Sequence, residues 1–131
     1  DLIKVGLVRK IVSRGISIGE IGVTGKARII KNDLDISLIC PGEIIFVPKE
    51  LMENIPLCKN IAGIVTNQNV DDVYALFNKN NKKISTICNL DNIDNPQISN
   101  GDLITLQLNE GVIYMGQIED DEDAIDKYKY V

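Results

Sequence analysis

This 131-residue chain contains no histidine, and this absence limits the residues that could do chemistry. Its three cysteines, Cys40, Cys58 and Cys88, are far apart and form no Cys-x-x-Cys pair. Structural zinc sites need clustered thiolate or imidazole ligands, so this spacing does not predict one. We expect three reduced cysteines, with Cys88 in the core, and neither metal ligands nor cofactor-binding residues in this chain.

Two other stretches could hold an ion by their composition. Gly19, Gly22 and Gly25 have a Gly-x-x-Gly-x-x-Gly spacing, but a nucleotide loop links a buried strand to a helix, and Lys26 to Ile30 is typical of a strand. The run Asp91 to Asn100 is rich in aspartate and asparagine, yet it lacks the spacing and closing glutamate of an EF-hand. We therefore interpret the glycines as turn residues and the acidic run as a solvated loop.

The stretch from Asn60 to Leu90 predicts a strand, a polar turn, a short helix and a second strand. Ile61 to Thr66 is apolar and β-branched, as expected of a strand buried on both faces. Asn69 is placed to cap a helix whose core-facing residues recur every three or four positions, and these are Val70, Val73, Tyr74 and Phe77. Alternation in Ile84 to Cys88 predicts the second strand.

The same criteria predict strands on both sides of this stretch. They are expected at Lys26 to Ile30, Glu43 to Val47, Asp102 to Leu108 and Val112 to Met115, and the last two form a hairpin. Lys31 to Cys40 is expected to be a connection. Pro48 is expected to start a helical turn, after which apolar residues cover a face of the sheet, namely Leu51, Met52, Ile55 and Leu57. The fold class is therefore α/β, with a mixed sheet and few short helices.

The central stretch resembles the mobile (swivelling) domain of the PEP-utilising enzymes. In that family a strand ending in Val-Thr leads into a Gly-Gly turn, then Ser-His-Ala on a helix, then a second strand. Val65, Thr66 and Ala75 match this pattern, whereas Tyr74 stands at the histidine position. The other departures are Val73 for the serine, Asn69 and Val70 for the glycines, and Asn89 for the glycine after the second strand. The resemblance covers roughly Arg14 to Gly116 and implies a swivelling β/β/α fold.

These departures bear directly on chemistry. A chain without histidine cannot form the phosphohistidine with which such domains carry a phosphoryl group. Thr66 and Tyr74 are the candidate replacement acceptors, but no general base adjoins Tyr74 in the local sequence, and Asp71 and Asp72 would repel an incoming phosphate. We expect no catalytic residue: Tyr74 is predicted to be an inactive, buried packing tyrosine, and the face around Tyr74 and Phe77 to be core or subunit contact.

The first residues resemble a second family. Asp1 to Val8 reads Asp-Leu-Ile-Lys-Val-Gly-Leu-Val, which is similar to the closing strand of the pyruvate kinase C-terminal domain. In some pyruvate kinases an extra domain like the PEP-utiliser mobile domain follows directly after that strand. The resemblance implies a closing strand and linker at residues 1–13, a swivelling domain at 14–117 and an acidic tail at 118–131.

Charge and hydropathy limit the partners. The net charge of −5 argues against nucleic acid or an anionic membrane, and no apolar run approaches the roughly 20 residues of a membrane helix. Ile118 to Asp126 carries six acidic residues, whose mutual repulsion favours a solvated tail. No leader precedes Asp1 here, so the sequence does not say where the protein is sent; we expect a soluble protein, of the cytoplasm or of an organelle such as a plastid.

The resemblances imply a noncatalytic C-terminal appended domain of a pyruvate kinase. The parent enzyme would transfer a phosphoryl group from phosphoenolpyruvate to ADP with Mg²⁺ and K⁺. The domain's partners would be the rest of that enzyme and the neighbouring subunits of a homo-oligomer, and its role packing, oligomer stability or allosteric coupling. Two alternatives are a degenerate phosphoryl-carrier domain of an enzyme like pyruvate phosphate dikinase, and a free-standing binding or scaffold protein of swivelling fold.

Overall fold

The computed structural model describes residues 10–95 and 97–116 of the chain. In this part of the chain the strands are β1 (Ile11–Arg14), β2 (Ile16–Ile18), β3 (Val23–Ile29), β4 (Ile44–Val47), β5 (Gly63–Thr66), β6 (Thr86–Cys88), β7 (Leu103–Gln107) and β8 (Val112–Met115). The helices are α1 (Asp33–Ile36), the 3₁₀ helix η2 (Lys49–Asn54) and α2 (Val70–Lys79).

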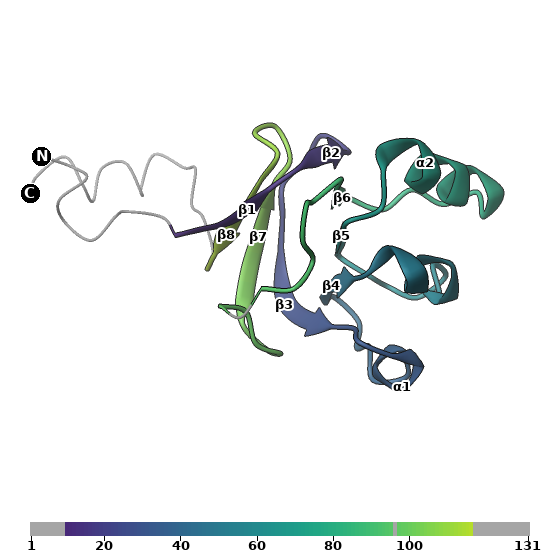
Figure 1. The fold of residues 1–131 in the computed structure, drawn as a ribbon, viewed down its shortest axis with the longest axis horizontal. Coiled ribbons are helices and arrows are strands. Elements are labelled where there is room, and N and C mark those ends of the chain that lie inside the picture. The colour runs from purple at the N-terminus through teal and green to yellow at the C-terminus, as the bar shows by residue number, and fades with distance from the viewer. Residues whose placement is uncertain (1–9, 96, 117–131) are drawn as a thin grey trace, which may run out of the picture.

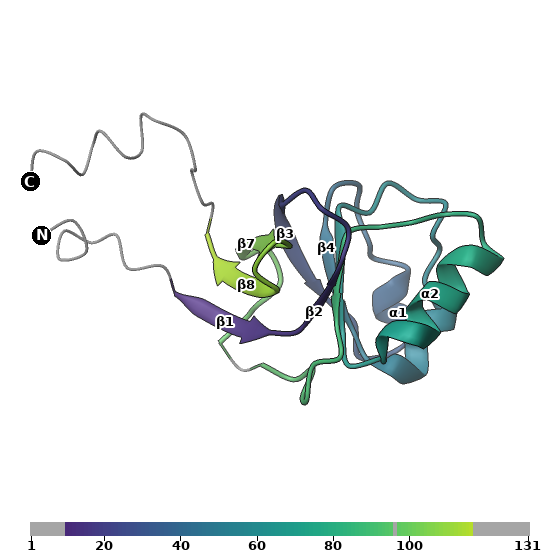
Figure 2. The same cartoon turned by 90° about the horizontal axis from the view of Figure 1, so that it is seen from above.

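The strands form one mixed sheet in the order β1-β8-β7-β3-β4-β5-β6-β2. Strands β3, β4, β5 and β6 are parallel, whereas β7, β8, β1 and β2 pair antiparallel with their neighbours. Figures 1 and 2 show α1 and α2 on one side of the parallel strands and β1, β7 and β8 on the other. The molecule therefore has three layers, two of strands and one of helices.

Each layer boundary contains its own apolar core, because the central strands are buried on both faces. Along β4, Ile45 and Val47 pack with Val73 and Phe77 of α2 in a cluster beneath the helices. The alternate side chains of β4 enter a second cluster between the strand layers, which includes Ile44, Phe46, Val65, Ile87, Ile104, Leu106 and Ile113. The apolar run of β4 is thus explained by burial on two sides.

Gly15 joins the two ends of this sheet. Strand β1 pairs with β8 at one end and β2 pairs with β6 at the other, yet only Gly15 separates β1 from β2 in sequence. The Gly15 amide donates to the carbonyl of Gly111 at 2.9 Å, and a Cβ at Gly15 would collide with the carbonyl oxygen of Cys88. Both ends of the sheet therefore meet at a position where only glycine fits, and the sheet curls around its inner core.

An ion pair fixes the connection between α1 and β4 to strand β3. Arg28 donates to both carboxylate oxygens of Glu43, with Nε 3.1 Å from Oε1 and Nη2 2.9 Å from Oε2. Glu43 is buried, and its Oε1 also accepts from the backbone amide of Cys40 at 2.7 Å. Burial by itself would raise the pKa of Glu43, but these hydrogen bonds outweigh it and hold that pKa below its ordinary value.

Most of the elements predicted from the sequence are confirmed. Six of the observed strands, β3 to β8, lie at the predicted places with ends shifted by three residues or fewer, and α2 follows Asn69 as expected. The apolar residues after Pro48 pack beneath the helices, and Met52 and Cys88 are both buried in that cluster. The fold is α/β with a mixed sheet and few helices, as predicted.

Three elements were not anticipated. Strands β1 and β2 precede Gly19, Gly22 and Gly25, the glycines that we interpreted as turn residues, and no strand was predicted there; α1 lies in the expected connection from Lys31 to Cys40. The signal for α1 is Asn32, whose side chain accepts from the amide of Asp35 as an N-cap. The domain boundary expected at residue 14 falls within β1, whereas Asp1 to Val8 and the acidic tail lie outside the described residues.

Replacing Gly15 with alanine is expected to lower the free energy of unfolding by about 1–3 kcal/mol, because the new methyl group must displace backbone at the junction of β2 and β6. Urea unfolding of the 131-residue chain measures the change. Ser13→Ala, in the same segment, serves as the control and should alter stability by about 0.5 kcal/mol or less. An unchanged midpoint for Gly15→Ala would show that the sheet ends do not meet there.

The depressed pKa of Glu43 predicts acid-sensitive stability. The unfolded state binds this proton more readily, so the stabilisation is complete above the ordinary value of 4.5 and is lost as the pH falls through the folded-state pKa. Glu43→Gln should cost about 1–3 kcal/mol at neutral pH and flatten the decline below pH 4.5. Unfolding followed at a series of pH values tests this, with the exposed Glu20→Gln as a charge-matched control that leaves the decline intact.

Candidate functional site

The start of α2 is the first candidate site, because the residues matched to the family's phosphoryl-carrying turn lie there. Asn69 is the N-cap, and its Oδ1 accepts from the backbone amide of Asp72 at 2.9 Å. Its Nδ2 donates in return to the carboxylate of Asp72 at 2.8 Å. A helix N-terminus attracts anions through free amides and its dipole, but here one amide is already used and a carboxylate is in place.

Thr66, a possible replacement acceptor, cannot be reached from solvent. It ends β5, is completely buried, and its hydroxyl accepts from the backbone amide of Gln68 at 3.1 Å. A hydroxyl in this position stabilises the turn into α2. The arrangement gives Thr66 a structural part in the connection between strand and helix.

Tyr74 is placed differently from our expectation of a buried tyrosine, which was wrong. The side chain is 40% exposed, whereas Val73 and Phe77 are buried beneath α2. Each helical residue advances about 100° around the axis, so Tyr74 falls at the border of the apolar stripe. It lines a shallow hollow of about 340 Å³ together with Phe77, Asn78, Asn81, Lys82 and Lys83. The structure thus places Tyr74 on the surface, whereas Thr66 is buried.

Cys88 ends β6 and Asn89 follows it directly, and the structure explains both residue types. Asn89 has φ of 65°, a left-handed conformation that asparagine tolerates better than most residues, which accounts for asparagine where the family has glycine. Burial raises the pKa of the Cys88 thiol to about 11, so at neutral pH it is protonated and not nucleophilic. Cys40 and Cys58 are exposed free thiols.

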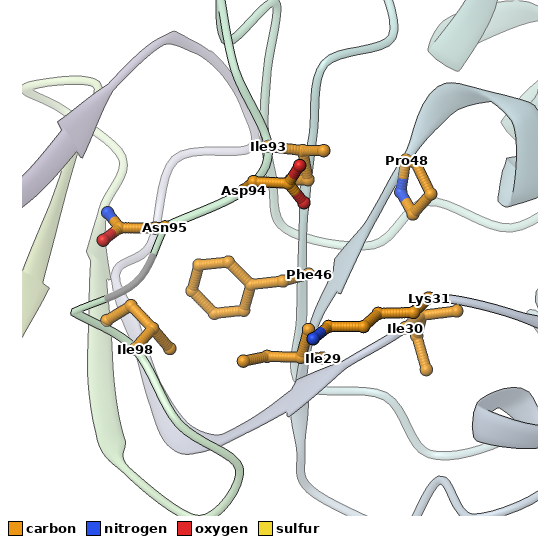
Figure 3. A pocket seen from close by; sticks show the side chains of 9 residues that line it. All are labelled: Ile29, Ile30, Lys31, Phe46, Pro48, Ile93, Asp94, Asn95 and Ile98. Atoms are coloured by element: carbon orange, nitrogen blue, oxygen red, sulfur yellow. The ribbon is translucent and has the colours of Figure 1, made fainter.

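A second candidate is a pocket at the carboxyl ends of β3 and β4. It has a volume of about 530 Å³, and Figure 3 shows the side chains that line it. Its wall is mostly apolar, and two charged side chains and one amide also face it. The lining residues are Ile29, Ile30, Lys31, Phe46, Pro48, Ile93, Asp94, Asn95 and Ile98.

Sequence reasoning did not identify this pocket. Its walls come from β3, β4 and the loop after β6, which are separated in the chain and meet only in the folded sheet. We had interpreted Asp91 to Asn100 as a solvated loop, and Asp94 alone gave no reason to single it out. The available signal was the parallel order of β3 and β4, since ligands in such sheets bind beyond the carboxyl ends of strands.

The described residues, 10–95 and 97–116, contain neither a candidate metal cluster nor a helix able to span a membrane. Among them, no three histidine, cysteine, aspartate or glutamate side chains are grouped so that they could hold a metal ion. The helices described there are too short and too polar for any of them to cross a membrane.

Comparison with known sequences gives one informative relative. The chain is 29% identical over 118 residues to pyruvate kinase 2 of Synechocystis sp., and the match covers 90% of this chain but 20% of that protein. No protein-family model matches the sequence. The chain therefore corresponds to a region related to pyruvate kinase and spans about a fifth of the relative's length.

Solved structures resemble this fold at low sequence identity. RraAS2 from Streptomyces coelicolor, described as an unusual member of the RNase ES inhibitor RraA protein family, superposes with a TM-score of 0.57 at 15% identity, covering 96% of this chain and 81% of that one. The microcin C7 self-immunity protein MccF gives 0.53 at 12% identity, covering 79% and 41%. Neither is a PEP-utiliser mobile domain by description, and at these identities they inform the fold alone.

Removing the cap at the start of α2 should destabilise the chain. Asn69→Ala deletes both hydrogen bonds with Asp72, and we expect the free energy of unfolding to fall by about 1 kcal/mol. Asn78→Ala, at an exposed position of the same helix, is the matched control and should be neutral or slightly stabilising because alanine favours helix. Equal losses in the two variants, measured by urea unfolding, would contradict the capping role.

Proposed function

We propose that this chain is a noncatalytic domain appended to a pyruvate kinase, of the swivelling β/β/α type, and that it contributes packing and oligomer stability. The relation to pyruvate kinase 2 supports the parent, since the match takes in most of this chain and a small part of that protein. A region of that proportion suits an appended domain. The parent would carry the chemistry, transferring a phosphoryl group from phosphoenolpyruvate to ADP with Mg²⁺ and K⁺.

The noncatalytic part of the proposal rests on Tyr74, which stands at the histidine position. It rests also on the start of α2, where the capping groups already have hydrogen-bond partners. Asn69 and Asp72 occupy each other's hydrogen-bonding groups, and the carboxylates of Asp71 and Asp72 oppose an incoming phosphate. Thr66 is buried. With no imidazole in the chain, a phosphoryl-carrier domain like that of pyruvate phosphate dikinase has no residue to carry the group.

The surface around Tyr74 is the contact face in this proposal. Tyr74 is partly exposed and lies over a hollow whose rim is formed by polar and cationic side chains. Tyrosine combines a large apolar ring with a polar tip, and it is enriched in protein interfaces. Its partner here would be the rest of the parent enzyme or a neighbouring subunit of a homo-oligomer in a soluble compartment.

Tyr74→Ala in the full-length enzyme should loosen assembly without altering the chemical step. Loss of an aromatic side chain from an interface commonly costs 1 kcal/mol or more, so we expect the subunit dissociation constant to rise by about tenfold. Analytical ultracentrifugation measures assembly, and turnover at concentrations that maintain the oligomer measures chemistry. Tyr74→Phe keeps the ring and should behave as the parent protein does.

Two results would contradict the proposal. One is a collapse of turnover in both Tyr74 variants with assembly unchanged, which would assign the phenol a chemical role. The other is a stoichiometric phosphoryl adduct on Tyr74 or Thr66 after incubation of the 131-residue chain with labelled phosphoenolpyruvate, detected by intact mass.

A further inference from the structure

The pocket at the ends of β3 and β4 has the size and position of a small-molecule site. Its volume of about 530 Å³ lies within the range of about 300–1,000 Å³ usual for ligand pockets. Two of its lining residues, Phe46 and Ile30, are almost completely buried, at 4% and 2% exposure, and we call them the floor of the pocket. Side chains fixed in the core cannot collapse into the space, so the apolar floor is preformed.

The loop that forms the opposite wall is anchored at several points. Asn95 donates through Nδ2 to the carbonyl of Val12 at 3.4 Å, and Asn100 accepts from the amide of Ile29 at 2.7 Å. Ile98 from the same loop is buried in the inner core. The loop is therefore held against β3, and the pocket between them is a built feature of the fold.

Two opposite charges, on the exposed side chains of Lys31 and Asp94, line the pocket where solvent reaches it. Among the described residues, the ammonium of Lys31 and the carboxylate of Asp94 make no hydrogen bond or ion pair. Figure 3 shows Asp94 above and Lys31 below the Phe46 side chain in this view. Asn95, the remaining polar side chain, already donates to Val12 and accepts from the amide of Gln97. The free polar groups are thus one cation and one anion over an apolar floor.

We propose that this pocket binds a small zwitterion with an apolar side chain, of the α-amino acid class. The ligand carboxylate pairs with Lys31, its ammonium pairs with Asp94, and its side chain rests on Phe46 and the surrounding isoleucines. A monoanion satisfies Lys31 but meets the charge of Asp94, and a monocation has the reverse difficulty. This site does not depend on the proposed function, since it rests on residues far from Tyr74 in the sequence and needs no parent enzyme.

Binding is tested on the 131-residue chain with L-leucine as the probe, followed by amide chemical-shift changes. We expect saturable shifts at Lys31, Phe46 and residues 93–95. Three comparison compounds separate the contributions: 4-methylpentanoate lacks the amine, isoamylamine lacks the carboxylate, and glycine lacks the apolar side chain. Each should bind about tenfold more weakly than leucine or not at all, since each loses one of the three interactions.

Lys31→Met and Asp94→Asn remove the charges while keeping side-chain size, and each should weaken leucine binding by about three- to tenfold. Asp91→Asn on the same loop, whose side chain does not line the pocket, is the matched control and should bind as the parent chain does. The proposal is overturned if leucine gives no saturable shifts, if both pocket variants bind it unchanged, or if 4-methylpentanoate or isoamylamine binds as well as leucine. These results leave the assembly test of Tyr74 unaffected, so the two proposals fail separately.

Discussion

The meeting of both sheet ends at Gly15 is the constraint on which the rest of this structure depends. An open sheet of this length would leave two edges with unpaired amides and carbonyls. Here one segment, β1–Gly15–β2, covers β8 at one end and β6 at the other. The curl that results encloses the inner core and turns the parallel strands so that their outer face receives α2 and η2. The two cores lie on opposite faces of the parallel strands.

The parallel strands end together at one edge, and this edge holds both regions that bear on function. Strand β5 leads through Thr66 to the start of α2, while β3 and β4 end at the pocket. Asn67 links the two regions, because its side-chain oxygen accepts from the amide of Lys49 just after β4 at 2.8 Å. The helix start is closed by its own capping residues, whereas the pocket beside it keeps open space and free charges. The proposed ligand site at this edge therefore lies beyond β3 and β4.

The start of α2 and the pocket beyond β3 and β4 also differ in whether their charged groups have partners. At the helix start, Asn69 and Asp72 consume each other's hydrogen-bonding groups and leave negative charge where a phosphate would need to approach. Arg28 and Glu43 likewise form a closed pair whose function is to fix the connection before β4. Lys31 and Asp94 differ because the described structure pairs neither of them. The Arg28–Glu43 pair contributes to stability, whereas we propose that Lys31 and Asp94 serve to recognise a ligand.

The sequence by itself determined most of the local structure. Apolar β-branched runs predicted β3 to β8, and the cap at Asn69 with its helical spacing predicted α2, because these signals depend on neighbours within a few residues. The lack of histidine is a property of composition, and by itself it excluded a phosphohistidine. Strands β1 and β2 were missed because they are short and half-exposed, and their pairing partners are β8 and β6, far along the chain. The exposure of Tyr74 and the pocket that joins Lys31, Phe46 and Asp94 were decided by tertiary structure alone, because each depends on how the helix and the loop after β6 pack on the sheet.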